Sequence, residues 1–190
     1  KLALKKSKHE LPKSEPFTKL KQVTVVEVER YGGMMSTQRL RHLIAHDQQQ
    51  QSLLDFVLFE VGISGIEHLE LNGQLKDAVK LSHISLDAFL TLIQSVERIV
   101  TERGGVSEDT LFQELGSSEE FRHIVSLALD PDFKNEIFRN LLELSARLEH
   151  NALGVWGLES DSLVVPRRVS DKIYLVLRHH GKPMHFRDIT

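Results

Sequence analysis

Residues 89–115, FLTLIQSVERIVTERGGVSEDTLFQEL, form a stretch with a glycine pair near its middle. A second stretch follows the same plan at residues 17–44, FTKLKQVTVVEVERYGGMMSTQRLRHLI, and PRRVSDKIYLVLRHHGKPMHFRDI at residues 166–189 begins it a third time. Each copy of an internal repeat folds as one supersecondary unit, so a repeat sets the architecture of the whole chain. We therefore expect a tandem array.

The copies align on Gly32, Gly104 and Gly181. Mostly apolar residues recur four, eight and twelve positions before each glycine, which is the spacing of one helix face. These residues are Val28, Thr24 and Leu20 in the first copy, Val100, Val96 and Leu92 in the second, and Leu177, Ile173 and Val169 in the third. Each copy is therefore predicted to begin with an amphipathic helix that ends at the glycine, which takes a left-handed conformation without steric cost.

A second, capped helix is predicted after each glycine. Ser36 and Ser107 occupy N-cap positions, and a leucine follows four residues after each of them. In the third copy His185 and Ile189 repeat this spacing with a weaker cap.

Each complete copy also has room for a third helix and a hairpin. QQQQSLLDFVLFE at residues 48–60, capped by Asp47, and DPDFKNEIFRNLL at residues 130–142 are the predicted third helices. Hairpin turns are expected at Asn72-Gly73 and around His150. Three helices followed by a hairpin form the winged-helix arrangement, so the predicted fold is mainly α with small β-hairpin wings in tandem winged-helix repeats.

The repeat divides the 190-residue chain into four parts. Residues 1–16 are predicted to be a flexible basic lead-in, residues 17–85 unit 1, residues 86–163 unit 2, and residues 164–190 the truncated start of a third unit.

Charge is divided unevenly along the chain, although the net charge is only −3. Residues 1–50 carry +5, residues 51–165 carry −12 and residues 166–190 carry +4. Basic ends and an acidic middle favour partners of both signs, although charge placed for solubility gives a similar gradient.

Catalytic and cofactor motifs are missing from the sequence. With no cysteine, disulfides, thiolate zinc sites and cysteine nucleophiles are excluded, and a reducing, cytoplasmic compartment is expected. His42 and His46 lie four apart, but no third metal ligand accompanies them, and the glycine pairs lack the rest of a phosphate loop. We expect neither a cofactor, a metal nor an enzyme. Apolar runs are too short for a membrane span.

The final 35 residues carry a family resemblance. WGLESDSLVVPRRVSDKIYLVLRHHGKPMHFRDIT, at residues 156–190, resembles the entry to a HARE-type helix-turn-helix module, in which an apolar helix leads to glycine, Lys-Pro, an apolar residue and an aromatic. This winged-helix relative occurs in the delta subunit of bacterial RNA polymerase, in restriction-associated proteins and in chromatin regulators. The wider order is similar to the C-terminal extension of some bacterial sigma-like factors.

The resemblance and the charge division together predict a transcription-associated, DNA-binding module. Duplex-reading helices need Arg, Lys, Asn or Gln. The first predicted third helix has no Lys or Arg, and in the second Lys134, Asn135, Arg139 and Asn140 stand among acidic residues. The basic ends are better candidates for DNA phosphate contact. The candidate DNA-binding residues are Lys5, Lys6, Lys8, Arg39, Arg41, His42, Arg167, Arg168, Lys172, Lys182 and Arg187.

Two kinds of partner remain open. In the first hypothesis the basic ends contact DNA, while the acidic central unit contacts RNA polymerase or another transcription protein. In the alternative, the units form a protein-interaction scaffold with no direct DNA contact.

Overall fold

A computed structural model describes residues 15–70, 73–185 and 187. The predicted lead-in lies outside the described residues, apart from its last two positions. Those two positions already belong to the first helix, α1 (Glu15–Arg30), so this helix begins earlier than the predicted boundary at residue 17.

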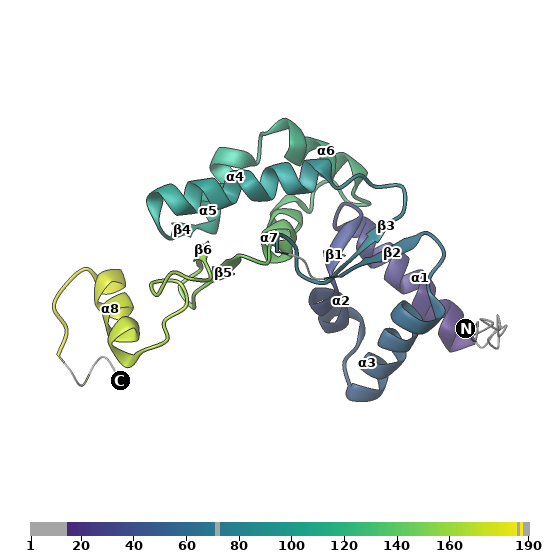
Figure 1. The fold of residues 1–190 in the computed structure, drawn as a ribbon, viewed down its shortest axis with the longest axis horizontal. Coiled ribbons are helices and arrows are strands. Elements are labelled where there is room, and N and C mark those ends of the chain that lie inside the picture. The colour runs from purple at the N-terminus through teal and green to yellow at the C-terminus, as the bar shows by residue number, and fades with distance from the viewer. Residues whose placement is uncertain (1–14, 71–72, 186, 188–190) are drawn as a thin grey trace, which may run out of the picture.

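The two predicted units contain the same order of elements: a helix, a short strand, further helices and a hairpin (Figure 1). Unit 1 consists of α1, β1 (Met34–Ser36), α2 (Thr37–Ile44), α3 (Gln48–Asp55), a π-helix η1 (Phe56–Val61), β2 (Ile66–Leu69) and β3 (Ala78–Leu81). Unit 2 consists of α4 (Asp87–Arg103), β4 (Val106–Ser107), α5 (Glu108–Leu115), α6 (Glu119–Leu127), α7 (Lys134–Leu144), β5 (Leu148–His150) and β6 (Val155–Leu158). A last helix, α8 (Val169–His180), follows them.

The described chain is mainly helical, with two small antiparallel sheets of three strands. In both sheets the last strand lies in the middle, giving the orders β1-β3-β2 and β4-β6-β5. Val79 is therefore paired with Met35 on one side and His68 on the other, and Trp156 lies between Val106 and His150. The short strand after each first helix thus closes the hairpin into a sheet.

The predicted helix ends and the caps of the first two copies are confirmed, whereas the second helix predicted for the third copy, after His185, lies largely outside the described residues. Gly32, Gly104 and Gly181 all have positive φ angles, of 82°, 77° and 68°. The side chains of Ser36 and Ser107 accept hydrogen bonds from the backbone N–H groups three residues later, and Asp47 caps α3 in the same way. Local sequence rules therefore place these helices correctly.

Other features differ from the sequence predictions. Helix α6 was not predicted, although Ser118 caps it by accepting a hydrogen bond from Phe121. The two strands β1 and β4, which complete the sheets, were also missed. In the first hairpin Leu69 is paired with Ala78. Asn72 of the predicted Asn72-Gly73 turn lies outside the described residues, so that turn stays a prediction.

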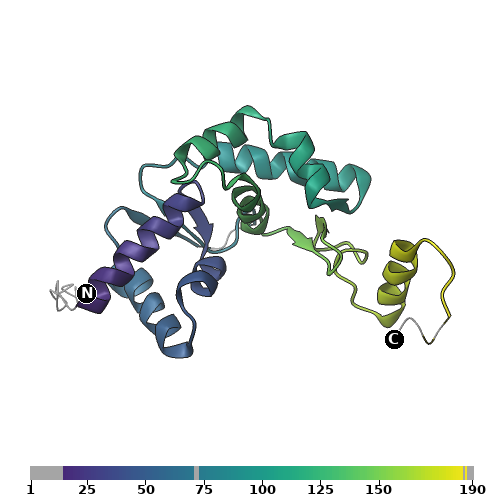
Figure 2. The same cartoon turned by 180° about the vertical axis from the view of Figure 1, so that it is seen from behind.

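The two units share one hydrophobic core, which joins residues from Val28 to Trp156. Figures 1 and 2 show the shared body as an arch, with α4 and α6 along its top and α8 apart from it at one end. Gly32, which follows α1, lies so close to α6 that an added Cβ would stand 2.7 Å from Cγ2 of Ile124. The glycine is therefore required both for its backbone conformation and for the approach of the units.

We expect the Gly32→Ala variant to lose about 3 kcal/mol of unfolding free energy, because the alanine would be strained at positive φ and would clash with Ile124. Gly65→Ala is the matched control, since Gly65 has a similar φ of 85° but open space around its added Cβ. That variant should lose only about 1 kcal/mol. Urea denaturation followed by circular dichroism measures both, and equal losses would contradict the close approach.

Candidate functional site

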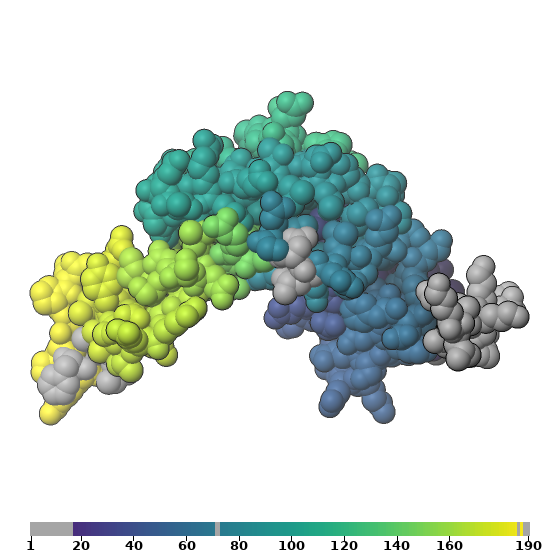
Figure 3. All heavy atoms as spheres, viewed as in Figure 1, coloured from purple at the N-terminus to yellow at the C-terminus, as the bar shows by residue number. Residues whose placement is uncertain are grey.

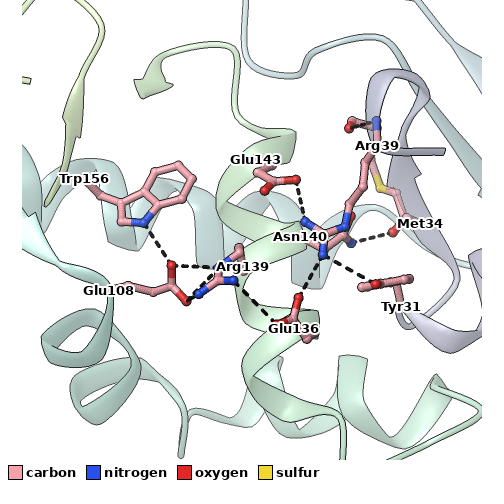
Figure 4. Close-up of polar contacts among 10 residues, drawn as sticks. Tyr31, Met34, Arg39, Glu108, Glu136, Arg139, Asn140, Glu143 and Trp156 are labelled. Atoms are coloured by element: carbon pink, nitrogen blue, oxygen red, sulfur yellow. Dashed lines mark hydrogen bonds and ion pairs between the residues drawn. The ribbon is translucent and has the colours of Figure 1, made fainter. Parts of the chain in front are cut away.

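The joint between the two units is built around α7. This helix, the predicted third helix of unit 2, packs on β1 of unit 1. Asn140 is fully buried, and its side-chain amide donates a 2.8 Å hydrogen bond to the backbone carbonyl of Met34 (Figure 4). A second backbone link lies beside it, where Lys76 N–H donates to the Leu144 carbonyl and Ala146 N–H donates to that of Gln74. We call these contacts the inter-unit joint.

Arg39 connects α2 to the same joint. Its guanidinium forms ion pairs of 3.0 Å with Glu136 and 2.7 Å with Glu143, both on α7, and it lies 4.8 Å above the ring of Tyr31. Burial lowers the pKa of Arg39, but hydrogen bonds to Tyr31 and Glu143 outweigh it, so the net pKa is raised. Arg39 stays charged and serves the joint. Because its guanidinium already pairs with two carboxylates, Arg39 is not free to pair with DNA phosphate.

A neighbouring network fixes the other face of α7. Arg139 binds Glu108 at 2.9 Å, and the indole N–H of Trp156 donates to the same carboxylate at 3.3 Å (Figure 4). The hydrogen bond to Glu108 and the adjacent Glu136 raise the pKa of Arg139 against the opposing effect of burial. Of the four polar residues predicted as possible groove contacts on this helix, Arg139 and Asn140 are engaged by other residues of the protein, although the Arg139 side chain is 47% exposed, whereas Lys134 and Asn135 are exposed.

A cleft of about 910 Å³ lies between α2 and the β5–β6 hairpin; we call it the α2 cleft. It brings together Arg39, Arg41 and His42, three of the sequence candidates. Arg41 forms a 2.8 Å ion pair with Asp55, and Lys76 on the opposite wall pairs with Glu149 at the same distance. The charges that line the α2 cleft are thus largely neutralised within the protein.

The remaining described candidates gather around α8. Arg167, Arg168, Lys172 and Lys182 are exposed, and none of them forms an ion pair with another described residue. Asp171, the acidic residue of α8, accepts a hydrogen bond from the backbone N–H of Arg168 at the start of the helix. Arg187 is also exposed, and its backbone N–H donates to His185. The candidates Lys5, Lys6 and Lys8 lie outside the described residues.

The α8 segment therefore differs from the two units in how its cations are used. The arched body pairs many of its arginines and lysines with carboxylates, whereas α8 buries none of its side chains and presents its cations to solvent. Sequence reasoning grouped the α2 and α8 candidates together because both lie in the basic ends of the chain. It missed the α7 carboxylates, which approach α2 only through the tertiary fold.

Groups of three or more metal-ligating side chains do not occur within the described residues. His42 and His46 are both exposed on or just after α2. None of the helices in the described part of the chain has the length and apolar content of a membrane span.

Comparison with protein-family models, curated proteins and solved structures finds no match to this chain.

The inter-unit joint predicts that substitutions of two arginines, Arg39 and Arg103, differ in their effect on the free energy of unfolding. Arg39→Met should lower the free energy of unfolding by about 2 kcal/mol, because two half-buried carboxylates lose their shared charged donor. Arg103→Met is the control, since Arg103 pairs with Glu114 at the exposed surface and should cost less than about 0.5 kcal/mol. Thermal and urea denaturation provide the measurement. A loss for Arg103→Met as large as that for Arg39→Met would rule out the special role of the joint.

Proposed function

We propose that the chain is a non-enzymatic, DNA-associated transcription module built from tandem winged-helix units. Its basic ends hold the DNA backbone, and its acidic central unit contacts RNA polymerase or another transcription protein. The single observation that carries the DNA contact is that Arg167, Arg168, Lys172 and Lys182, on α8 and beside it, are exposed and form no ion pair with another described residue. The resemblance of residues 156–190 to the HARE-type module supports the transcriptional setting.

The order of elements supports the winged-helix proposal. Each unit has a helix, a short strand, further helices and a hairpin, and in each sheet the short strand pairs with the last strand. Winged helices use this arrangement to support a third helix and a hairpin wing. Unit 2 carries α6 in addition, between its second helix and the helix that follows.

The contact with DNA is proposed to be to phosphate and not to base edges. The third helix of unit 2 packs one face into the joint, and its Arg139 is already paired with Glu108. Gln48–Asp55, the third helix of unit 1, contains no Lys or Arg. Base reading usually needs a helix that enters the major groove with such side chains. Exposed cations on α8 neutralise phosphates without such an insertion, which gives binding that depends strongly on salt.

The protein contact is assigned to the outer surface of unit 2. Glu102, Asp109 and Glu119 are exposed there and form no ion pair with another described residue. An acidic surface of this kind favours a basic partner surface and accelerates its association.

The scaffold without DNA contact remains the second candidate. The burial of α7 favours it, because the element that most often reads DNA in this arrangement is used here to join the units. The two candidates differ in one result: the scaffold shows no duplex binding even at low salt.

The DNA proposal is tested with the variant Arg167→Gln, Arg168→Gln, Lys172→Gln in an electrophoretic mobility shift assay on duplex DNA. We expect binding of the wild-type chain to weaken steeply with salt. Removing three phosphate contacts should lower affinity by about tenfold or more and reduce the slope of log K against log salt by about 2 to 3.

The matched control removes cations from the arch. Arg98→Gln, Arg122→Gln lies on α4 and α6, where both side chains are exposed, and should leave the salt slope nearly unchanged. Equal effects of the two variants would show that the cations of α8 have no special role. Absence of duplex binding by the wild-type chain at low salt would refute the DNA proposal and favour the scaffold.

A further inference from the structure

A groove runs between α8 and the hairpin of unit 2. It comprises two adjoining cavities of about 570 and 310 Å³, which share Asn151, Leu153 and Leu175 as lining residues. We call it the α8 groove. Its apolar lining consists mainly of Leu153, Val155, Val164, Val165, Leu175 and Val176.

Two of these apolar side chains stay largely open to solvent. Leu153, in the hairpin turn, is 41% exposed, and Val176, on α8, is 38% exposed. Exposed apolar side chains that face one another across a groove are typical of a surface that binds another molecule. The space-filling view shows the end of the molecule that carries α8 resting against the segment that follows the hairpin (Figure 3).

The wall contributed by α8 is also positively charged. Lys172, Arg178 and His179 line the cavities and lie on the same side of the helix as Leu175, since they are three or four residues from it. Neither Lys172 nor Arg178 forms an ion pair with another described residue. The cations therefore remain available to a ligand in the groove.

The opposite wall neutralises only part of this positive charge. It contains two carboxylates, those of Glu149 and Glu159. Glu149 already forms a 2.8 Å ion pair with Lys76, which projects from unit 1. Glu159 forms no ion pair with another described residue, so one carboxylate stands against the two cations Lys172 and Arg178. The α8 groove thus combines an apolar floor with a small excess of positive charge, and complementarity calls for an apolar ligand that carries negative charge.

We propose that the α8 groove docks a short amphipathic segment of a partner protein, one that carries apolar side chains flanked by Asp or Glu. Its apolar side chains lie between Leu153 and Leu175, and its carboxylates meet Lys172 and Arg178. This inference goes beyond the DNA contact and rests on the groove alone. Duplex DNA matches the cations, but its phosphates and sugars do not fill an apolar floor.

The probe for this proposal is a fluorescein-labelled helical peptide with Leu on one face, at a spacing of three and four, and Glu elsewhere. A second peptide replaces every Glu with Lys. Fluorescence anisotropy with the full chain should show saturable binding of the acidic peptide and none of the basic one.

Three variants locate the binding. Leu153→Ser, Leu175→Ser should raise the Kd by about tenfold or more, because anchors at the centre of a docking site dominate its affinity. Lys172→Gln, Arg178→Gln should raise it by about fivefold, the effect of two exposed charge pairs. Ile173→Ser is the control, since Ile173 is on the opposite side of α8 and should change the Kd by less than about twofold. Circular dichroism checks that each variant is folded.

Several results would overturn the proposal. These are failure of the acidic peptide to bind, equal binding of both peptides, or a larger effect of Ile173→Ser than of Leu153→Ser, Leu175→Ser. Concentration-dependent dimerisation of the peptide-free chain, abolished by Leu153→Ser, Leu175→Ser, would assign the groove to a second copy instead. The duplex mobility shift should be unchanged by the leucine variant, so loss of peptide binding and loss of DNA binding are separate outcomes.

Discussion

The packing of α7 between the two units determines how the units are joined and which of their surfaces stay exposed. Asn140 has no exposed surface, and its amide hydrogen bond to the Met34 carbonyl satisfies a backbone group of β1 that would otherwise be buried without a partner. Once this helix is committed to the joint, the two units act as one body with one core. The face of α7 that carries Asn140 cannot contact a DNA groove without the joint being broken, so the internal use of this face restricts the ways in which the chain binds a partner.

The inter-unit joint also determines which charged side chains are paired inside the protein and which remain available at its surface. Glu136 and Glu143 make up part of the acidic middle, yet both face Arg39 across the joint and hold it in place. Net charge counted along the sequence therefore overstates how much acidic surface is free, and it overstates the free basic surface of α2 in the same way. The α8 segment is the contrasting case, because its single acidic residue is used at the start of its own helix. Its cations are thus left for external ligands.

The sequence predicted well whatever depends on neighbours within a few residues. Glycines that end helices and serines that cap them follow from local backbone geometry, and both were placed correctly. The joint could not be predicted, because Arg39 meets Glu136 and Glu143 across separations of 97 and 104 residues. The strands β1 and β4 were missed for a related reason: two or three residues carry no alternation, and their pairing with the hairpins exists only in the folded unit.

The three glycine-terminated helices show why a repeated pattern need not have a repeated role. The residue eight positions before the glycine is fully buried in α1 and α4, as Thr24 and Val96, but Ile173 of α8 is 37% exposed. The local sequence produces the apolar face of each helix, whereas the burial of that face depends on the strands and helices that pack against it. In α1 and α4 that layer consists of the sheet and the following helices of the same unit. Within the described residues α8 has no such layer, so its side chains are accessible. The repeat that builds a core twice therefore leaves α8 accessible the third time. Both proposed contacts, with DNA and with an acidic partner segment, use this accessible helix through its cations and the side that carries Leu175, and not through the face that carries Ile173.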